Sequence, residues 1–213
     1  MQTTIYLLRH GQSQGNAAGC FLGQSDLDLT ELGHRQAQCA AMAARDLPLD
    51  RIYSSDLCRA WHTTEPVAAL HGLPIHPAPG FREIYAGLWE MHPFTELITR
   101  FGAEYTCWRT DIAHAHPTGG ESVRQLYDRV FAALEQVEAD SRGLTVLIGT
   151  HATPIRMLMA RIQYGSLEAA NTIAWVPNAS ITKFICTDGI WQLEYAGDDR
   201  HLGALHTNLP ATV

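Results

Sequence analysis

The segment Ile5-Tyr6-Leu7-Leu8-Arg9-His10-Gly11 gives the first indication of the fold. A short apolar run that ends in polar residues is typical of a strand whose carboxyl end lies where α/β folds bind their ligands. The imidazole of His10 can attack phosphorus while one ring nitrogen keeps its lone pair, and the guanidinium of Arg9 matches two phosphate oxygens. Gly11 lets the backbone approach a ligand. The segment therefore predicts a phosphate site, although so short a motif is equally consistent with an ordinary polar strand end.

The next residues extend this prediction. A helix is expected to begin at Ser13, and the free N–H groups of its first turn favour an anion. Asn16 adds a side-chain amide donor on the same segment.

Helices and strands alternate along the rest of the chain. Apolar stripes at spacings of three and four predict helices over 31–45, 57–70 and 121–140 and from Pro154 onward. Apolar runs predict strands around 51–54 and 144–149, and Asp188-Gly189 predicts a hairpin between 180–187 and 190–195. We expect Pro66 to bend or break its helix and 72–80 to form a loop.

This alternation predicts an α/β fold with three layers, α/β/α, around a mostly parallel central sheet. The 213 residues, 46% of them hydrophobic, are enough for one sizeable core. We therefore expect a single domain over residues 1–213. The aromatic and polar residues between Pro93 and Thr118 indicate a small helical cap insertion at about 91–119.

Composition excludes several classes of function. The formal charge is −7 and basic residues do not cluster, which argues against binding to nucleic acid or to an anionic membrane. No segment approaches the roughly 18 consecutive apolar residues of a membrane span, and no leader-like segment begins the chain. The five cysteines form no C-x-x-C pair, so we expect reduced thiols and a cytoplasmic protein. The eleven histidines lack metal-ligand spacing, and we expect no metal and no cofactor.

Three further segments supply chemistry at the same predicted sheet edge. Thr150-His151 ends the strand at 144–149, and Arg59 follows the strand at 51–54. A second histidine and a second guanidinium would stabilise the charge of a transferring phosphoryl group. Glu83 would donate a proton to the leaving oxygen, because an alkoxide leaves with difficulty at neutral pH. Taken singly, His151 is also consistent with a strand-end hydrogen bond, Arg59 with a solvated helix start and Glu83 with a surface carboxylate.

In their order and context, six segments together resemble the motifs of the histidine phosphatase superfamily, the phosphoglycerate-mutase-like proteins. They are Leu8-Arg9-His10-Gly11 through Asn16; Leu29-Thr30-Glu31-Leu32-Gly33; Ser54-Ser55-Asp56-Leu57-Cys58-Arg59-Ala60; Phe81-Arg82-Glu83-Ile84 with Gly87 and Trp89-Glu90; Gly119-Gly120-Glu121-Ser122; and Thr150-His151.

The resemblance implies a role for each candidate residue. His10 would be the phosphorylated nucleophile, and Glu83 the general acid and later the base. The phosphate pocket would consist of Arg9, Arg59 and His151, with Asn16 as a helper. Gly11, Gly23 and Ala152 are expected beside the substrate. The reaction would proceed in two steps through phosphohistidine, without a metal.

Positions at which this sequence departs from the family pattern indicate the branch within the family. Gly15 stands where cofactor-dependent mutases carry tryptophan, and the stretch between Glu83 and His151 is shorter than theirs. Both favour a metal-independent phosphomonoesterase of the histidine acid phosphatase type that acts on a small phosphorylated metabolite. The alternatives are a cofactor-dependent phosphoglycerate mutase and a catalytically silent phosphate-binding protein.

Two other departures concern substrate binding, and one feature concerns assembly. Met91 replaces the usual glycine after Trp-Glu and is expected to narrow or reshape the mouth of the site. Ala152-Thr153 replaces a Gly-rich pair, and the hydroxyl of Thr153 is expected to face the substrate. A homodimer is left open, because the tail from Gly197 can lie free or pack on another chain.

Overall fold

The protein is described by a computed structural model, in which residues 1–207 are placed. Within that range lies one six-stranded sheet with the order β3-β2-β4-β1-β5-β6. Its strands are β1 (Gln2–Arg9), β2 (Arg51–Ser54), β3 (Ile75–Pro77), β4 (Thr145–Thr150), β5 (Ile181–Thr187) and β6 (Ile190–Asp198). Strands β1 to β4 pair in parallel, whereas β5 pairs antiparallel with both β1 and β6. The predicted mostly parallel sheet is confirmed.

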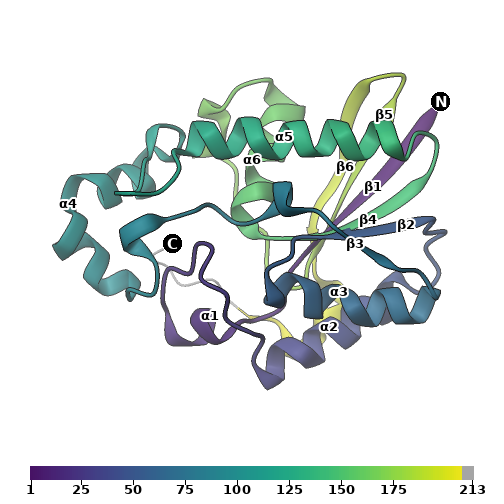
Figure 1. Cartoon of the computed structure of the whole chain (residues 1–213), viewed down its shortest axis with the longest axis horizontal. Coiled ribbons are helices and arrows are strands. Elements are labelled where there is room, and N and C mark those ends of the chain that lie inside the picture. Colours follow the sequence, from purple (N-terminus) through teal and green to yellow (C-terminus); the bar gives the residue numbers. More distant parts are fainter. Residues whose placement is uncertain (208–213) are drawn as a thin grey trace.

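Helices cover both faces of this sheet (Figure 1). Helices α2 (Glu31–Ala44) and α3 (Cys58–His71) lie on one face, and α5 (Val123–Asp140) and α6 (Ala152–Tyr164) lie on the other. Alternate side chains of β1 enter the two cores, with Tyr6 and Leu8 on the α2–α3 side and Ile5 and Leu7 on the α5–α6 side. The predicted three-layer α/β/α architecture is therefore confirmed.

The helix starts follow the expected chemistry. The hydroxyl of Thr30 accepts the N–H of Gly33 and caps α2. Ser122 and Gln125 form a capping box at the start of α5. Ser13 and Asn16 form another at α1 (Gln14–Ala18).

Two local predictions were wrong in part. Helix α3 continues through Pro66 without a break, because the proline removes only one bond of the helical ladder and the adjacent Val67 and Ala68 are buried. The expected loop at 72–80 contains the short edge strand β3. Three residues that include a proline carry too little periodicity to reveal a strand.

The expected helical segment near the sheet edge contains α4 (Phe94–Thr110), which is interrupted at Gly102, and a 3₁₀ turn at Ile112–His114. Figure 1 shows α4 beyond the carboxyl ends of the parallel strands. Further 3₁₀ turns lie at Pro79–Phe81, Gly87–Trp89, Glu168–Asn171 and Arg200–Leu205.

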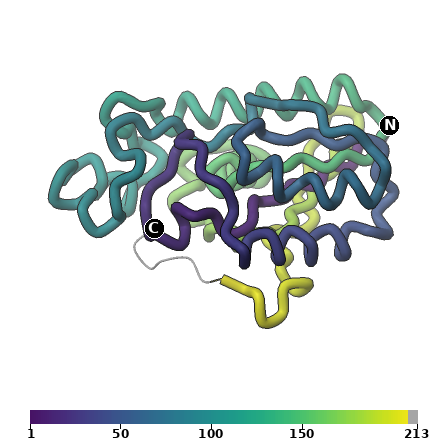
Figure 2. Tube along the Cα trace, turned by 60° about the horizontal axis from the view of Figure 1, so that its bottom comes forward, coloured from purple at the N-terminus to yellow at the C-terminus, as the bar shows by residue number. Residues whose placement is uncertain are grey.

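The carboxyl-terminal part confirms the hairpin and fixes most of the tail. Asp188 and Gly189 connect β5 and β6 with φ values of 50° and 83°, as a tight hairpin turn requires. The turn at Arg200–Leu205 packs along α2 (Figure 2), where the Gln36 amide donates to the Leu205 carbonyl at 2.8 Å. Up to residue 207 the tail therefore lies against its own chain, and the rest lies outside the described residues.

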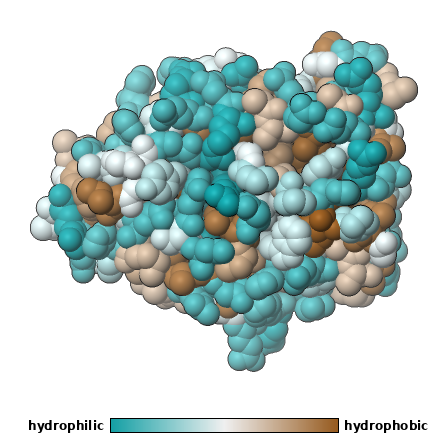
Figure 3. Space-filling model, in the orientation of Figure 1, coloured by the Kyte–Doolittle hydropathy of each residue, from teal (hydrophilic) through white to brown (hydrophobic). Residues whose placement is uncertain are grey.

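The surface offers no membrane anchor in the described part of the chain: none of its helices has the length and apolar character needed to cross a bilayer. The face drawn in Figure 3 is mostly hydrophilic, with apolar residues in separate small groups.

Candidate active site

Strand register brings the predicted residues to one edge of the sheet. Arg9 at the end of β1 lies opposite Thr150 at the end of β4, and Ser54 of β2 lies opposite Gly149. The N–H of His10 then donates to the Thr150 carbonyl at 3.0 Å. Consequently the residues that follow three parallel strands meet at a single place.

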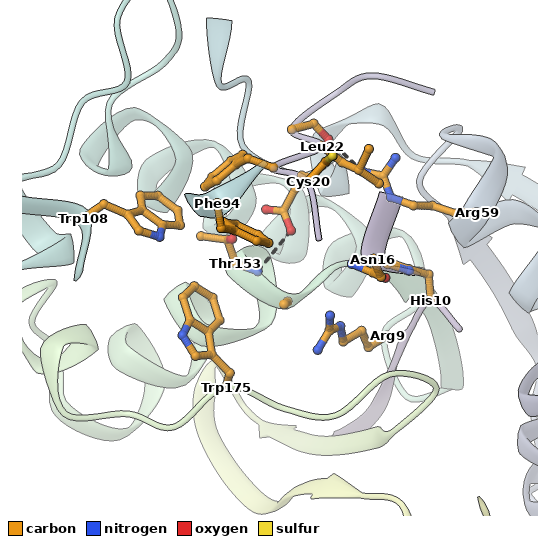
Figure 4. Close-up of a pocket in the computed structure, with 14 residues that line it drawn as sticks. Arg9, His10, Asn16, Cys20, Leu22, Arg59, Phe94, Trp108, Thr153 and Trp175 are labelled. Atoms are coloured by element: carbon orange, nitrogen blue, oxygen red, sulfur yellow. Dashed lines mark hydrogen bonds between the residues drawn. The ribbon is translucent and has the colours of Figure 1, made fainter. Parts of the chain in front are cut away.

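An open cavity of about 640 Å³ occupies this place (Figure 4). Arg9, His10, Asn16 and Arg59 lie at one end, and Phe94, Trp108 and Trp175 lie at the other. Of the predicted residues, those that line the cavity are Arg9, His10, Asn16, Gly23, Arg59, Glu83, Ala152 and Thr153.

His10 is held as a neutral imidazole. Its Nδ1–H donates to the Gly11 carbonyl at 2.7 Å, because a carbonyl can only accept. Burial, followed by the charges of Arg59 and Arg9, holds the pKa of His10 well below its ordinary value. The lone pair at neutral pH is therefore on Nε2, and the ring is fixed by its other nitrogen.

Arg9 and Arg59 are both buried guanidinium groups. Arg9 donates from Nη1 to the Val176 carbonyl at 2.5 Å, and its Nε has no partner within residues 1–207. Arg59 donates to the carbonyls of Gly23 and Ser25, at 2.7 and 2.9 Å. Burial lowers the pKa of Arg9 to about 10 and lowers that of Arg59, and nearby Glu83 opposes both shifts. Arg9 therefore stays charged at neutral pH, and no carboxylate within the described residues forms an ion pair with either arginine.

His151 lies behind His10 and does not line the cavity. Its ring centroid is 5.2 Å from that of His10, and its Nε2 is 2.8 Å from the Ser55 hydroxyl. Burial, and then the charge of Arg59, hold its pKa well below the ordinary value. Its Nδ1 is buried without a partner among the placed residues. Ser55, which orients this ring, was not singled out from the sequence.

Glu83 lines the cavity as a half-buried carboxylate. Its Oε1 accepts the N–H of Ile84 at 2.8 Å, and its Oε2 accepts the N–H of Thr153 at 3.4 Å. The backbone carbonyl of Glu83 accepts from the Gln24 amide at 3.1 Å and from Arg129 at 3.3 Å. Side chain and backbone are thus fixed separately.

Arg129 and Glu90, which the sequence did not single out as site residues, position the loop that carries Glu83, residues 80–86, which we call the acid loop. Arg129 also donates to the carbonyls of Gly80 and Arg82 and pairs with Glu121. The carboxylate of Glu90 accepts three bonds: the N–H groups of Gln24 and Ala86 at 2.8 and 3.0 Å and the Ser25 hydroxyl at 2.7 Å. Glu90 and Glu121 belong to two of the quoted motifs, but Arg129 carried no such signal.

The remaining predicted residues differ in where they lie. The Oδ1 of Asn16 accepts from Ser13 at 3.1 Å and from Asn178 at 3.3 Å, whereas its Nδ2 has no hydrogen-bond acceptor within residues 1–207. Gly11 does not line the cavity, and its N–H donates to the Thr63 hydroxyl at 3.0 Å. A Cβ at Gly11 would lie 2.6 Å from the Gly33 carbonyl. Packing against α2, rather than approach to a ligand, therefore requires glycine there.

Met91 does not narrow the mouth as expected, because it is exposed and is not part of the cavity lining. Its φ of 66° lies in the left-handed region, which explains why the family pattern has glycine at this position.

Comparison with known proteins places the chain in a family. The family model of the histidine phosphatase superfamily (branch 1) matches residues 5–199. The chain belongs to this superfamily. The resemblance drawn from the six motifs is thus confirmed.

Two curated relatives and one solved structure show how close this superfamily member is to known proteins. The adenosylcobalamin/alpha-ribazole phosphatase of Salmonella typhimurium is 32% identical over 187 residues, or 88% of this chain and 87% of that protein. The probable phosphoglycerate mutase GpmB of Escherichia coli O1:K1 is 34% identical over 209 residues, or 94% and 95%. The structure of Bacillus stearothermophilus YhfR superposes with a TM-score of 0.90 at 28% identity, covering 94% of this chain and 99% of that one.

The far end of the cavity in this superfamily member is apolar and aromatic. Besides Phe94 it is lined by Phe21, which contacts Phe94 and Trp108, and by two tryptophans, Trp108 and Trp175, which stack with centroids 6.1 Å apart. The charged residues that line the cavity are Arg9, Arg59 and Glu83. Trp175 follows a 3₁₀ turn in an irregular segment, and its sequence gave no sign of this role.

Proposed function

We propose that this superfamily member is a metal-independent phosphomonoesterase that works through a phosphohistidine. One observation carries the proposal: a neutral, tautomerically fixed His10 stands in a cavity with two buried guanidinium groups that lack ion-pair partners among residues 1–207. A phosphate dianion would supply the missing counter-charge to Arg9 and Arg59. The amide of Asn16 would donate a further hydrogen bond.

In the first step, Nε2 of His10 attacks phosphorus and forms the P–N bond while the P–O bond to the leaving group breaks. Glu83 gives its proton to the departing oxygen. The Gly11 carbonyl accepts from Nδ1 throughout and stabilises the positive ring. His151 does not itself line the cavity, but its ring centroid lies 5.2 Å from that of His10. We assign its Nδ1, which has no partner among residues 1–207, to an oxygen of the phosphoryl group that His10 attacks, as a neutral donor.

In the second step, the Glu83 carboxylate takes a proton from water as the water oxygen attacks phosphorus. The P–N bond breaks, and its electron pair returns to Nε2 of His10. Orthophosphate leaves, and Glu83 is again protonated for the next turnover. Glu83 thus gives one proton to the leaving oxygen and regains one from water, so the cycle closes without a metal.

The lining of the cavity also supports a class of leaving group. An uncharged, apolar or aromatic alcohol would pack on Phe94, Trp108 and Trp175. The carboxylate of a phosphoglycerate would meet no further cation in this lining, because both arginines are needed for the phosphate. This favours hydrolysis of the phosphate ester of an uncharged alcohol over the mutase alternative. The ester named in the Salmonella relative, α-ribazole phosphate, is one candidate of this class.

The test is phosphate release from a panel of esters in EDTA: α-ribazole phosphate, an aryl phosphate, glycerol phosphate and 3-phosphoglycerate. Release by the wild type that is absent in His10→Ala is the expected result, together with 32P from a labelled ester that stays on wild-type protein quenched in alkaline denaturant, in which a P–N bond survives. Release that continues in His10→Ala would refute the nucleophile.

The similarity to GpmB defines the second candidate, which the same panel separates. A mutase would require priming by a bisphosphoglycerate and would move the phosphoryl group between positions of phosphoglycerate. Isomerisation faster than phosphate release would establish that reaction instead.

A further inference from the structure

A second cavity, of about 350 Å³, adjoins the catalytic one. Trp108 and Trp175 line both cavities, so this tryptophan pair forms a shared wall. The other residues of the second cavity are polar or basic, apart from Ile112: Arg109, Thr110, Arg156 and Asn171. None of them lines the catalytic cavity, and the proposed reaction uses none of them.

Arg156, on α6, is the main feature of this cavity. Its guanidinium carbon lies 4.2 Å from the centroid of Trp175, and its Nε donates to the Ala170 carbonyl at 2.9 Å. Burial lowers its pKa to about 10, so the group stays charged at neutral pH. No carboxylate among residues 1–207 forms an ion pair with Arg156 or with Arg109.

A half-buried cation without a counter-charge is costly, and most such groups in proteins are paired. Within the described part of this chain, other arginines that lie next to carboxylates do form pairs, as Arg82 does with Asp56 and Arg129 with Glu121. Arg9 and Arg59 also lack such pairs, and under the proposed function a phosphate supplies their counter-charge. Arg156 repeats their situation on the other side of the tryptophan wall.

The acidic residue that lies between the lining residues Thr110 and Ile112 in the sequence does not neutralise Arg156. Asp111 follows Thr110, but its Oδ1 accepts from the Asn171 amide at 2.8 Å and its Oδ2 lies 2.9 Å from Nδ1 of His114. These two hydrogen bonds lower the pKa of Asp111, which is therefore a carboxylate already satisfied by its own partners. Asp111 is not part of the lining.

We propose that this second cavity binds a small oxyanion, a carboxylate or a phosphate, through Arg156 and Arg109. The planar fork of Arg156 offers paired N–H donors from Nη1 and Nη2, and Arg109 adds a second charge at the exposed rim. The anion is either free in solution or a second anionic group of the substrate. In the latter case the leaving group is uncharged where it packs on the tryptophans and carries the anion on a part that reaches past them. In both cases the ligand contacts the back of the wall against which the leaving group would pack.

Binding of free anion is measured first, by equilibrium dialysis with 32P-orthophosphate, which needs no turnover. Wild type is expected to bind two phosphates per chain and Arg156→Met one, whereas Arg59→Ala should keep the second site. Arg124→Met is the matched control, because Arg124 is an exposed arginine paired with Glu168 and should leave both sites intact. Arg109→Met, at an exposed position, tests the same site without risk to the fold.

The substrate arm compares kcat/KM for two alkyl phosphate esters that differ only in a distal carboxylate. If the anion is part of the substrate, Arg156→Met should lower the ratio of kcat/KM for the ester with the carboxylate to kcat/KM for the ester without it by about tenfold. Arg156→Lys should restore part of this ratio. Loss of the second phosphate in dialysis with an unchanged ratio assigns the site to a free anion. A single phosphate bound by wild type, together with an unchanged ratio in Arg156→Met and Arg109→Met, would overturn the proposal. Absence of all turnover would instead count against the proposed hydrolase, and the dialysis would still test this site.

Discussion

Replacement of Glu83 by glutamine should affect the substrates unequally. Glutamine keeps the shape of the side chain but cannot donate and recover a proton as a carboxylic acid does. Its Oε1 can still accept from Ile84, where the present bond is 2.8 Å long. The amide nitrogen would then face the N–H of Thr153, but the bond lost there is a weak one of 3.4 Å. We therefore expect a loss of unfolding free energy of about 1 kcal/mol at most.

The catalytic loss should depend on the leaving group. Proton donation by a positioned acid typically contributes about 10²–10⁴ in rate, so kcat/KM for an alkyl phosphate should fall by about that factor. An aryl phosphate whose phenolate leaves without a proton should lose less than about tenfold in its chemical step. Initial rates of phosphate release from both esters, at matched pH, give the two losses directly.

Equal losses on both esters would refute the assignment of Glu83 as the general acid. Glu96→Gln is the matched control, because Glu96 is an exposed carboxylate on α4 whose charged contacts, Arg100 at 3.5 Å and His92 at 3.9 Å, lie outside the cavity lining. It should leave both rates unchanged.

Three further predictions concern stability and charge. Burial holds the pKa values of His10 and His151 well below 6.5 in the folded protein, so the unfolded chain binds more protons below about pH 6.5. The free energy of unfolding should therefore be highest above about pH 6.5 and should decrease as the pH falls below that value. Urea unfolding between about pH 7 and 5 should show a shallower pH dependence for His151→Asn than for wild type, and parallel curves would contradict this. Arg59→Ala should lower kcat/KM by about 10²–10³ with little change in fold, measured by phosphate release and circular dichroism; an unchanged rate would remove it from the phosphate site. Gly11→Ala should cost about 1–3 kcal/mol in urea unfolding, because its Cβ would lie 2.6 Å from the Gly33 carbonyl, and an unchanged midpoint would refute that contact.

The predictable part of the site is the part that strand ends fix. Arg9 and His10 directly follow an apolar run, and His151 follows another, so the parallel pairing of β1 and β4 brings them together. Arg59 was read from a motif at a helix start, and its burial could not be inferred, because it depends on the carbonyls of Gly23 and Ser25.

Other residues depend on tertiary placement alone. Trp175 lies in an irregular segment without periodicity, which leads into β5, the neighbour of β1 in the sheet. Arg129 looks like any charged residue on an amphipathic helix, yet it binds three carbonyls of the acid loop. The requirement for glycine at position 11 was correctly noticed but assigned to a ligand, whereas the close neighbour is the backbone of α2.

The hydrogen bond from Arg9 to the Val176 carbonyl joins the two ends of the catalytic cavity. Val176 is the residue after Trp175, so the guanidinium at the phosphate end is anchored to the peptide that carries the aromatic wall. Any displacement of Arg9 toward a bound anion must either stretch this bond or draw Trp175 with it. An anion that binds at Arg9 would therefore also shift the position of Trp175. Through this hydrogen bond, the phosphate of an ester and the packing of its leaving group would be coupled.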